Sequence, residues 1–481
     1  MTSPPASPNA IRFWVLALTS LASMMVALDT LVVSTALTTI RLDLGASIEQ
    51  LEWTVNSYNL SLAVLMMTAA VLGDRFGRRR MFVSGLALFV AASAASALSP
   101  GVGWLIAART VQGVGAAFVM PLALSLLSEA FPVDRRAWAL GIFSGLTGLA
   151  VAGGPVVGGA IAEGVAWQWI FWLNVPLGLV AIPLVLARVP ESRGERTALD
   201  LRGLVLVFGA ALGVVWGLVR ANSAGWRSLE VVATLAGGVL LALGFVAWES
   251  RAPEPMLSLR LFRSRAFASG NTANFLQYAA LFGSVFFMAQ FLQTGLGYGP
   301  LDAGIRLMPW TGTLFVTAPI AGLLVGRMGE RPIVVGGLLL QALGLVWLAV
   351  LAEPGVAYTS LIAPLIVTGC GTSLVFPATQ NAVLGSVAPS QAGKASGSFS
   401  TGRELGGVFG IAVAVALFAG TGGYRSAQEF TDGFRVALAG ATGLALLGAL
   451  VGTALPSRSR RPAVETVETP MVPPVEAAVH R

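Results

Sequence analysis

The chain has 481 residues, of which 55% are hydrophobic and only 11% are charged. Soluble domains carry about 25% charged residues, and apolar runs of about 20 residues recur along this chain, so an ordinary soluble protein is excluded and a polytopic helical membrane protein is indicated. The net charge of +7 does not indicate nucleic-acid binding, because the arginines lie at the ends of apolar runs. With one cysteine and one histidine, Cys370 and His480, a disulfide framework and a Cys/His metal site are also excluded.

The hydropathy pattern predicts fourteen membrane-spanning helices, an all-α fold. They are expected at 13–39, 51–72, 79–98, 103–127, 138–162, 168–187, 202–220, 230–249, 267–293, 302–326, 332–352, 357–381, 397–420 and 434–455. With this count most of the 30 basic residues fall on one side of the membrane. Basic loops stay in the cytoplasm, so we expect both termini to be cytoplasmic. Only Lys394 is a lysine, a bias typical of GC-rich bacterial genomes, and we expect a bacterial cytoplasmic (inner) membrane.

The first predicted helix carries an acid, Asp29, well inside an apolar run. A charge at this depth costs a few kcal/mol, which makes it a functional candidate. Arg109, in the fourth predicted helix, lies at a similar depth, so the two could form a direct or water-bridged pair that protonation of Asp29 breaks. Two interpretations stay open: proton coupling, or a static ion pair that fixes the two helices.

The turn between the second and third spans is short and strongly basic. It reads Gly73-Asp74-Arg75-Phe76-Gly77-Arg78-Arg79-Arg80. This motif resembles the loop between helices two and three of major facilitator superfamily transporters. The resemblance implies a gating role for Gly73, Asp74, Arg75, Gly77, Arg78 and Arg79. Glu129, at the end of the fourth span, is expected to pair with Arg78 or Arg79; solvated surface charge is the alternative.

The fifth predicted helix carries small residues four apart, including Gly154 and Gly158, which allow another helix to approach closely. The run Gly154-Pro155-Val-Val-Gly158-Gly159 is similar to the antiporter signature of drug exporters, which implies a gating role for these four named residues. A generic helix contact is the alternative. The stretch 167–178, together with Leu28-Asp29-Thr30 and 53–58, resembles the fourteen-helix drug:proton antiporter branch, although Gln168 stands where that branch usually has a basic residue.

A weak internal repeat, Arg75-Phe76-Gly77-Arg78-Arg79 against Arg327-Met328-Gly329-Glu330-Arg331, indicates two parallel six-helix bundles. The remaining two spans form an extra hairpin between them. The expected organisation is a cytoplasmic N-terminus 1–12, an N-terminal bundle 13–187, a linker with two extra helices 188–266, a C-terminal bundle 267–455 and a disordered cytoplasmic tail 456–481.

The resemblance also implies a central substrate cavity. Aromatic, amide and thioether side chains there suit a bulky amphipathic ligand, and lipid-facing or core positions are the alternative. The candidates are Tyr58, Met120, Gln277, Tyr278, Phe286, Phe287, Gln290, Phe376, Gln380 and Asn381. Glu404, beside Arg403, is either a second proton or cation site or a structural contact. Adjacent helical residues point about 100° apart, so these two need not satisfy each other.

These features predict a secondary transporter that exports an antibiotic or several hydrophobic or cationic drugs in exchange for protons. No cofactor is expected beyond the proton gradient, and the expected partners are drug, protons and the lipid bilayer, with the chain a monomer. A proton-coupled transporter of a metabolite or nutrient is the main alternative. An ATP-driven pump is disfavoured because the chain lacks a Gly-x4-Gly-Lys-Ser/Thr phosphate-binding loop, and a membrane enzyme because it lacks a catalytic constellation.

Overall fold

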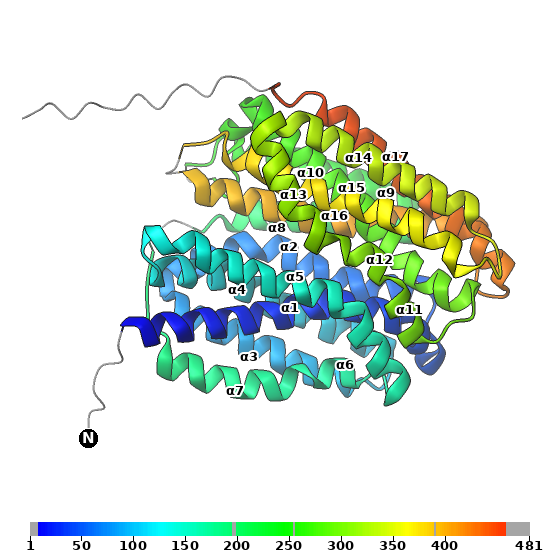
Figure 1. The fold of residues 1–481 in the computed structure, drawn as a ribbon, viewed down its shortest axis with the longest axis horizontal. Helices are drawn as coiled ribbons and strands as arrows, with labels where there is room; N and C mark the ends of the chain where they lie inside the picture. The colour runs from blue at the N-terminus through cyan, green and yellow to red at the C-terminus, as the bar shows by residue number, and fades with distance from the viewer. Residues whose placement is uncertain (1–7, 195–198, 254, 389–390, 458–481) are drawn as a thin grey trace, which may run out of the picture.

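The computed structural model describes residues 8–194, 199–253, 255–388 and 391–457. Within those ranges, fourteen helices are long and apolar enough to cross a membrane, which confirms the predicted number. Figure 1 shows two groups of roughly parallel helices lying side by side. The predicted tail lies outside the described residues apart from 456–457, and the predicted N-terminal segment is described only from Pro8, where the first helix already begins.

The N-terminal bundle holds the first six spans. Its helices are α1 (Pro8–Leu44), α2 (Ile48–Phe76), α3 (Arg78–Ala97), α4 (Val102–Ala130), α5 (Val133–Gly164) and the broken sixth span, α6 (Trp169–Trp172) with α7 (Asn174–Arg188). Ser47 starts α2 with a capping box, accepting from Gln50 N while the Gln50 side chain accepts from Ser47 N. Gly77, with φ of 113°, separates α2 from α3 without a longer loop.

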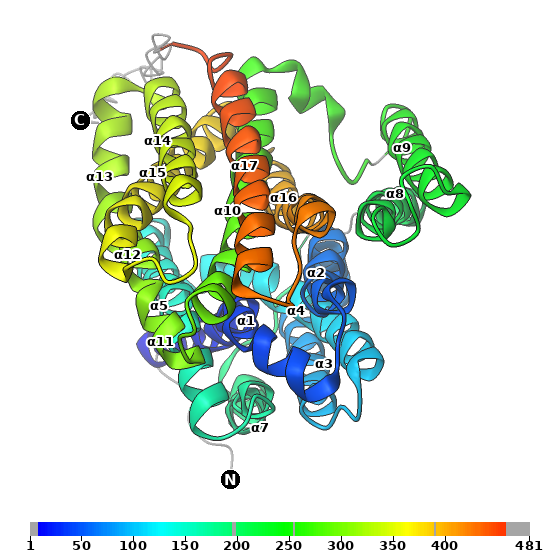
Figure 2. The same cartoon turned by 90° about the vertical axis from the view of Figure 1, so that its right-hand side faces the viewer.

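A hairpin of two extra helices, α8 (Leu201–Arg220) and α9 (Leu229–Glu249), follows the first bundle. Asp200 and Ser228 cap their first turns by accepting from Gly203 N and Val231 N. The hairpin stands at the edge of the molecule, where α8 lies beside α2 and α16 (Figure 2). The predicted insertion between the bundles is therefore present, on one side of their junction.

The C-terminal bundle holds the last six spans. Its elements are η1 (Leu259–Arg263), α10 (Arg265–Gln290), the π-helical turn η2 (Phe291–Gly295), α11 (Pro300–Arg306), α12 (Met308–Thr311), α13 (Thr313–Met328), α14 (Glu330–Leu351), α15 (Tyr358–Leu384), α16 (Ala392–Thr421) and α17 (Ala427–Gly452). The predicted span over 302–326 is confirmed as Pro300–Met328, although turns at Leu307 and Gly312 divide it into α11, α12 and α13. Pro309 has no N–H to donate, which disfavours an unbroken helix there.

The two ends of the bundles differ. We call the end that carries the turn Gly73–Arg80 the basic end, and the end where α1 finishes at Leu44 the opposite end. At the opposite end one apolar cluster joins both bundles, from Val32 and Val55 on one side to Phe287 and Phe291 on the other. Gln293 Nε2 donates to Thr35 O at 2.9 Å and Leu301 N donates to Glu163 Oε2 at 3.0 Å, also across the junction. The opposite end is therefore closed.

Candidate functional site

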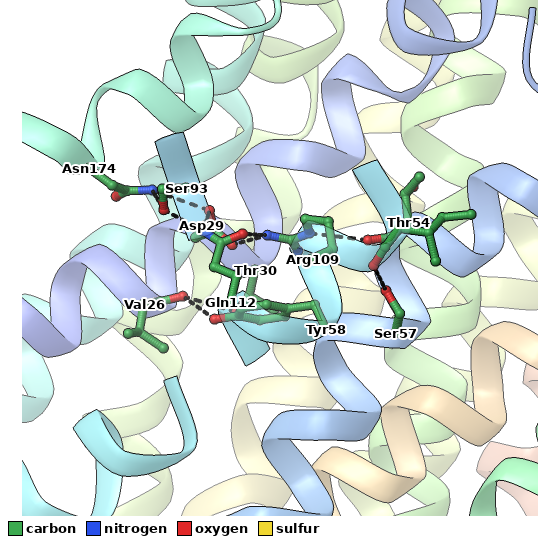
Figure 3. Close-up of polar contacts among 11 residues, drawn as sticks. Val26, Asp29, Thr30, Thr54, Ser57, Tyr58, Ser93, Arg109, Gln112 and Asn174 are labelled. Carbon is green, nitrogen blue, oxygen red and sulfur yellow. Dashed lines mark hydrogen bonds and ion pairs between the residues drawn. The ribbon is translucent and has the colours of Figure 1, made fainter. Parts of the chain in front are cut away.

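A buried ion pair joins α1 and α4 (Figure 3). The side chains of Asp29 and Arg109 are exposed by only 0% and 1%. Arg109 Nη1 donates to Asp29 Oδ2. The contact that the sequence predicts between these two residues is therefore confirmed, and it is direct.

The second oxygen of Asp29 has donors of its own. Gln112 Nε2, from α4, donates to Oδ1 at 2.9 Å, and Asn174 Nδ2, from the start of α7, donates at 3.3 Å. Both amides also donate to Ser93 Oγ on α3, at 2.8 and 3.4 Å. Four helices of the N-terminal bundle thus meet at one carboxylate.

Arg109 is held independently of Asp29. Its Nε donates to Thr54 O at 3.1 Å and its Nη1 also donates to Gln112 Oε1 at 2.8 Å. The guanidinium carbon lies 4.1 Å from the centroid of the Tyr58 ring and 5.6 Å from that of Phe171. The structure places Tyr58 against Arg109, fully buried, with its hydroxyl donating to Val26 O at 3.4 Å, rather than on the wall of a central cavity.

Arg109 keeps partners of its own if the charge of Asp29 is lost. Removing one partner of a buried ion pair costs about 3–5 kcal/mol when the other charge is left alone. A proton on Asp29 would leave Arg109 with a carbonyl, an amide oxygen and two aromatic faces, so the remaining charge keeps partners.

Several residues of this site are not predicted by the sequence pattern. Gln112 and Ser93 are fully buried and Asn174 is 2% exposed. Gln112 could have been found, because it follows Arg109 by three residues and so shares its helix face. Ser93 and Asn174 come from separate apolar runs, and only the packing of α3 and α7 brings them to Asp29.

A further buried acid, Glu52 on α2, also escapes the pattern, because it lies at the edge of a predicted span. Its side chain is fully buried and Oε1 accepts from Asn56 Nδ2 at 3.0 Å. Oε2 has no hydrogen-bond partner among the described residues. The Glu52 carboxylate thus accepts from an amide, whereas the Asp29 carboxylate is paired with a guanidinium.

The C-terminal bundle has a different charged pair. Glu404 Oε1 accepts from Arg403 Nη2 at 2.6 Å and from Arg403 Nε at 2.9 Å. The sequence left open whether these neighbours satisfy each other, and the structure shows that they do. The Arg403 guanidinium carbon also lies 5.5 Å from the Tyr278 ring centroid.

The predicted cavity residues separate into two groups. Tyr278 and Phe376 lie together, with ring centroids 6.2 Å apart, close to the Arg403–Glu404 pair. Gln277, from the same helix as Tyr278, is fully buried and donates to Thr372 O at 3.4 Å. Met120 packs at the margin of the N-terminal apolar core, and Gln380 is half-buried.

The other group makes packing and hydrogen-bond contacts within the C-terminal bundle. Phe286 and Phe287 belong to the apolar cluster that closes the opposite end, where Phe287 stacks on Phe418 at 4.5 Å. Gln290 accepts from the Tyr424 hydroxyl at the same end, and burial raises the pKa of that phenol. Asn381 Nδ2 donates to Glu330 Oε1 at 2.8 Å, a contact between α15 and α14. In this conformation these four residues hold the bundle together.

The basic turn is tied to its own bundle. Arg78 Nε contacts Asp74 Oδ1 at 2.7 Å and Arg78 Nη1 contacts Glu129 Oε2 at 2.8 Å, as the sequence predicts for Glu129. Arg79 donates from its backbone N–H to Glu191 Oε1 at 2.9 Å and from Nη1 to Val189 O at 3.0 Å. The turn thus joins the ends of α2, α3 and α4 to the segment after α7.

Helix α5 packs closely against α1 and α11 through its glycines. A Cβ added to Gly158 would lie 2.4 Å from Val32 O on α1. One added to Gly159 would lie 2.2 Å from Pro300 O on α11, and one added to Gly304 would lie 2.2 Å from Pro155 O. The close approach that the sequence predicts for α5 is present, and it reaches both bundles.

Taken together, fourteen apolar spanning helices in two bundles, with a buried ion pair inside the N-terminal bundle, describe a multi-pass membrane protein. Among the described residues, no group of three or more His, Cys, Asp or Glu side chains could hold a metal ion. The family model of the Major Facilitator Superfamily matches residues 19–312 and 270–478. The chain belongs to this family and is a transporter, not an enzyme.

Relatives of the chain include proteins named for export. It is 38% identical to the tetracenomycin C resistance and export protein of Streptomyces glaucescens, over 86% of this chain and 78% of that protein. It is 33% identical to the cephamycin export protein CmcT of Amycolatopsis lactamdurans, over 92% and 93% of the two chains, and 33% identical to the multidrug efflux pump LfrA of Mycolicibacterium smegmatis, over 93% and 88%.

Solved structures show the same fold at low identity. A crystal structure of the peptide transporter POT in complex with sulfate matches with a TM-score of 0.69 and 15% identity, over 92% of this chain and 95% of that one. A crystal structure of the nucleoside transporter NupG matches with a TM-score of 0.66 and 12% identity, over 92% and 99%. These two matches concern the fold alone.

Proposed function

We propose that this chain exports a hydrophobic or cationic drug across a bacterial cytoplasmic membrane in exchange for protons. The observation that carries the proposal is the direct, fully buried contact between Asp29 and Arg109. It supplies an acid whose charge can be cancelled by a proton without leaving Arg109 unpartnered. The three relatives named for export or efflux support the direction of transport.

The conformation fits one half of an alternating-access cycle. Basic loops stay in the cytoplasm, so the basic end faces inward and both termini are cytoplasmic. The closed opposite end then faces outward, so this conformation is not the outward-facing state of the cycle. In this cycle Asp29 takes up a proton when the outer end is open and releases it when the inner end is open and the drug binds.

The test measures proton release on addition of drug. Everted membrane vesicles are energised to acidify their interior, and the pH gradient is followed by quenching of an acridine dye. Ethidium added to vesicles with the parent protein should partly dissipate the gradient, because protons leave as ethidium enters. Asp29→Asn should abolish this response. Asp302→Asn is the matched control, because Asp302 is 56% exposed and paired with Arg306, and it should respond as the parent does.

Three results would contradict the proposal. One is a parent protein that transports ethidium with no proton movement. Another is an Asp29→Asn variant that releases protons as the parent does. A third is intact cells that accumulate ethidium because of the protein, which would indicate an importer.

A further inference from the structure

A cavity of about 510 Å³ lies between the extra hairpin and the N-terminal bundle. Its walls come from α2, α4, α8 and the start of α9, so it is separate from Asp29 and Arg109. Its volume falls within the range of pockets that hold drug-sized ligands, about 300–1,000 Å³. The hairpin therefore forms one wall of a cavity large enough to bind a ligand.

The walls of the cavity are aromatic and apolar. Trp53 of α2 faces Trp216 of α8, with ring centroids 5.6 Å apart and planes inclined by 49°. Phe208 and Leu60 line the space further along the same helices. Two of the wall hydroxyl groups are already used, because Ser57 Oγ and Thr110 Oγ1 both donate to Ile106 O, at 3.3 and 2.9 Å. A ligand here meets mainly indole faces and hydrocarbon.

The mouth of the cavity carries an excess of negative charge. Arg220 Nε lies 3.1 Å from Glu230 Oε1, and Trp216 Nε1 donates to the same oxygen at 2.9 Å. Arg220 Nη1 lies 3.5 Å from Glu49 Oε2, a looser contact. Two carboxylates thus share one guanidinium, and all three side chains are 30–39% exposed. Glu49 retains the capacity to pair with a second cation.

The charged mouth and the apolar walls of the cavity match the charged and apolar parts of a membrane amphiphile. Glu49 and Glu230 are near the first residues of their helices and Arg220 is the last residue of α8, all at the opposite end. The wall residue Ser61 lies twelve positions further along α2 than Glu49, about 18 Å deeper at 1.5 Å per residue. An amphiphile with its charge at the membrane surface and its rings in the hydrocarbon therefore matches the cavity end to end.

The cavity also borders the junction of the two bundles. One apolar cluster joins Leu60 of α2, Val215 of α8 and Val408 of α16. Asn222, just after α8, donates from Nδ2 to Ala416 O on α16 at 2.5 Å. A ligand in this cavity would thus lie next to α2 and α16, which belong to different bundles. The two bundles must move relative to one another in a transporter of this kind.

We propose that this cavity is a second ligand site, which takes a hydrophobic aromatic cation from the surrounding leaflet. The indole pair recognises the aromatic rings and Glu49 the positive charge. The site does not depend on proton exchange at Asp29. A lipid acyl chain could fill the same volume, but it would use neither the indole pair nor the unbalanced carboxylate.

The experiment maps where an aromatic cation binds. The full-length protein in nanodiscs of phosphatidylethanolamine and phosphatidylglycerol is photolabelled with azido-ethidium, and labelled peptides are identified by mass spectrometry. We expect labelling of the peptides that carry Trp53 and Trp216, competed by unlabelled ethidium. Glu49→Gln and Trp216→Leu should each raise the half-saturating concentration for this labelling about three- to tenfold. Trp216→Phe should retain most of the labelling.

The controls separate this proposal from the proposed function. Asp29→Asn should leave labelling of the hairpin unchanged, even where proton exchange is lost. Glu353→Gln, a 71% exposed carboxylate at the same end of the other bundle, should also leave it unchanged. Labelling confined to peptides of α1, α10 and α16 would overturn the proposal. So would equal labelling of Trp216→Leu and the parent, or a co-purifying phospholipid that ethidium does not displace and that Trp216→Leu releases.

Discussion

Both bundles hold an arginine next to a carboxylate inside the membrane, but they hold it in different ways. In the N-terminal bundle the pair connects α1 and α4 through residues 80 positions apart. In the C-terminal bundle Arg403 and Glu404 are neighbours on α16. A shift between helices can separate the first pair, whereas the second pair moves as one body. Of these two pairs, the Asp29–Arg109 pair is therefore the one that depends on the relative position of two helices.

The Asp29–Arg109 pair is also more deeply buried than the Arg403–Glu404 pair, and its carboxylate has more hydrogen-bond donors. The side chains of Arg109 and Asp29 are exposed by 1% and 0%, against 22% and 10% for Arg403 and Glu404. Asp29 has two further amide donors, while the described contacts of Glu404 come from Arg403. Charge is therefore more costly to leave unbalanced at Asp29, and we expect substitutions there to have the larger effects.

The largest effect is expected for Arg109→Met. This substitution leaves the Asp29 carboxylate buried with amide donors alone, and we expect it to lower the free energy of unfolding by about 3–5 kcal/mol. Adding Asp29→Asn to Arg109→Met should recover most of that stability, because no charge then remains unpaired, but it should not recover proton-driven ethidium export. The measurements are SDS-induced unfolding followed by circular dichroism and the vesicle assay.

Arg403→Met is the matched comparison for this cycle. Glu404 keeps 10% of its side chain exposed where Asp29 keeps none, so the loss of its partner should cost less than the loss of Arg109. An equal cost for Arg403→Met would show that the two pairs are energetically alike. A double variant no more stable than Arg109→Met would show that the cost does not come from an unpaired Asp29.

A smaller effect is expected from the helix that supports α1. In Gly158→Ala the new Cβ would lie 2.4 Å from Val32 O and 2.6 Å from Thr35 Oγ1, so α1 must move away from α5. Overpacking of this kind costs about 1–3 kcal/mol. Because Val32 is one turn from Asp29, we also expect ethidium export to fall in the vesicle assay.

Gly153→Ala is a direct control, since an added Cβ there meets nothing within 4 Å. It should leave stability and export near the parent values. If Gly158→Ala behaves in the same way as Gly153→Ala, close contact between α5 and α1 is not needed to hold Asp29 in place.

The sequence was a good guide to features that depend on periodicity and charge. Hydropathy predicts all fourteen spans, and the depth of Asp29 and Arg109 in their helices predicts their contact. The pattern does not show that Phe287 lies in the closed end of the bundles. The sequence alone does not distinguish an aromatic side chain that lines a cavity from one that packs in a core. Nor does it show Asn174 beside Asp29, since that contact depends on how α7 packs against α1.

The smallest effect is expected for Glu404→Gln. The Arg403 guanidinium then keeps the Tyr278 ring at 5.5 Å and some contact with solvent, so we expect a loss of about 1 kcal/mol or less in stability and less than a tenfold fall in ethidium export. The informative measurement is the number of protons released per ethidium transported. A ratio equal to that of the parent supports a self-neutralised pair that moves with α16. A ratio lower by one would mean that Glu404 carries a proton, and that a pair on a single helix can be separated by local hydration without relative movement of helices.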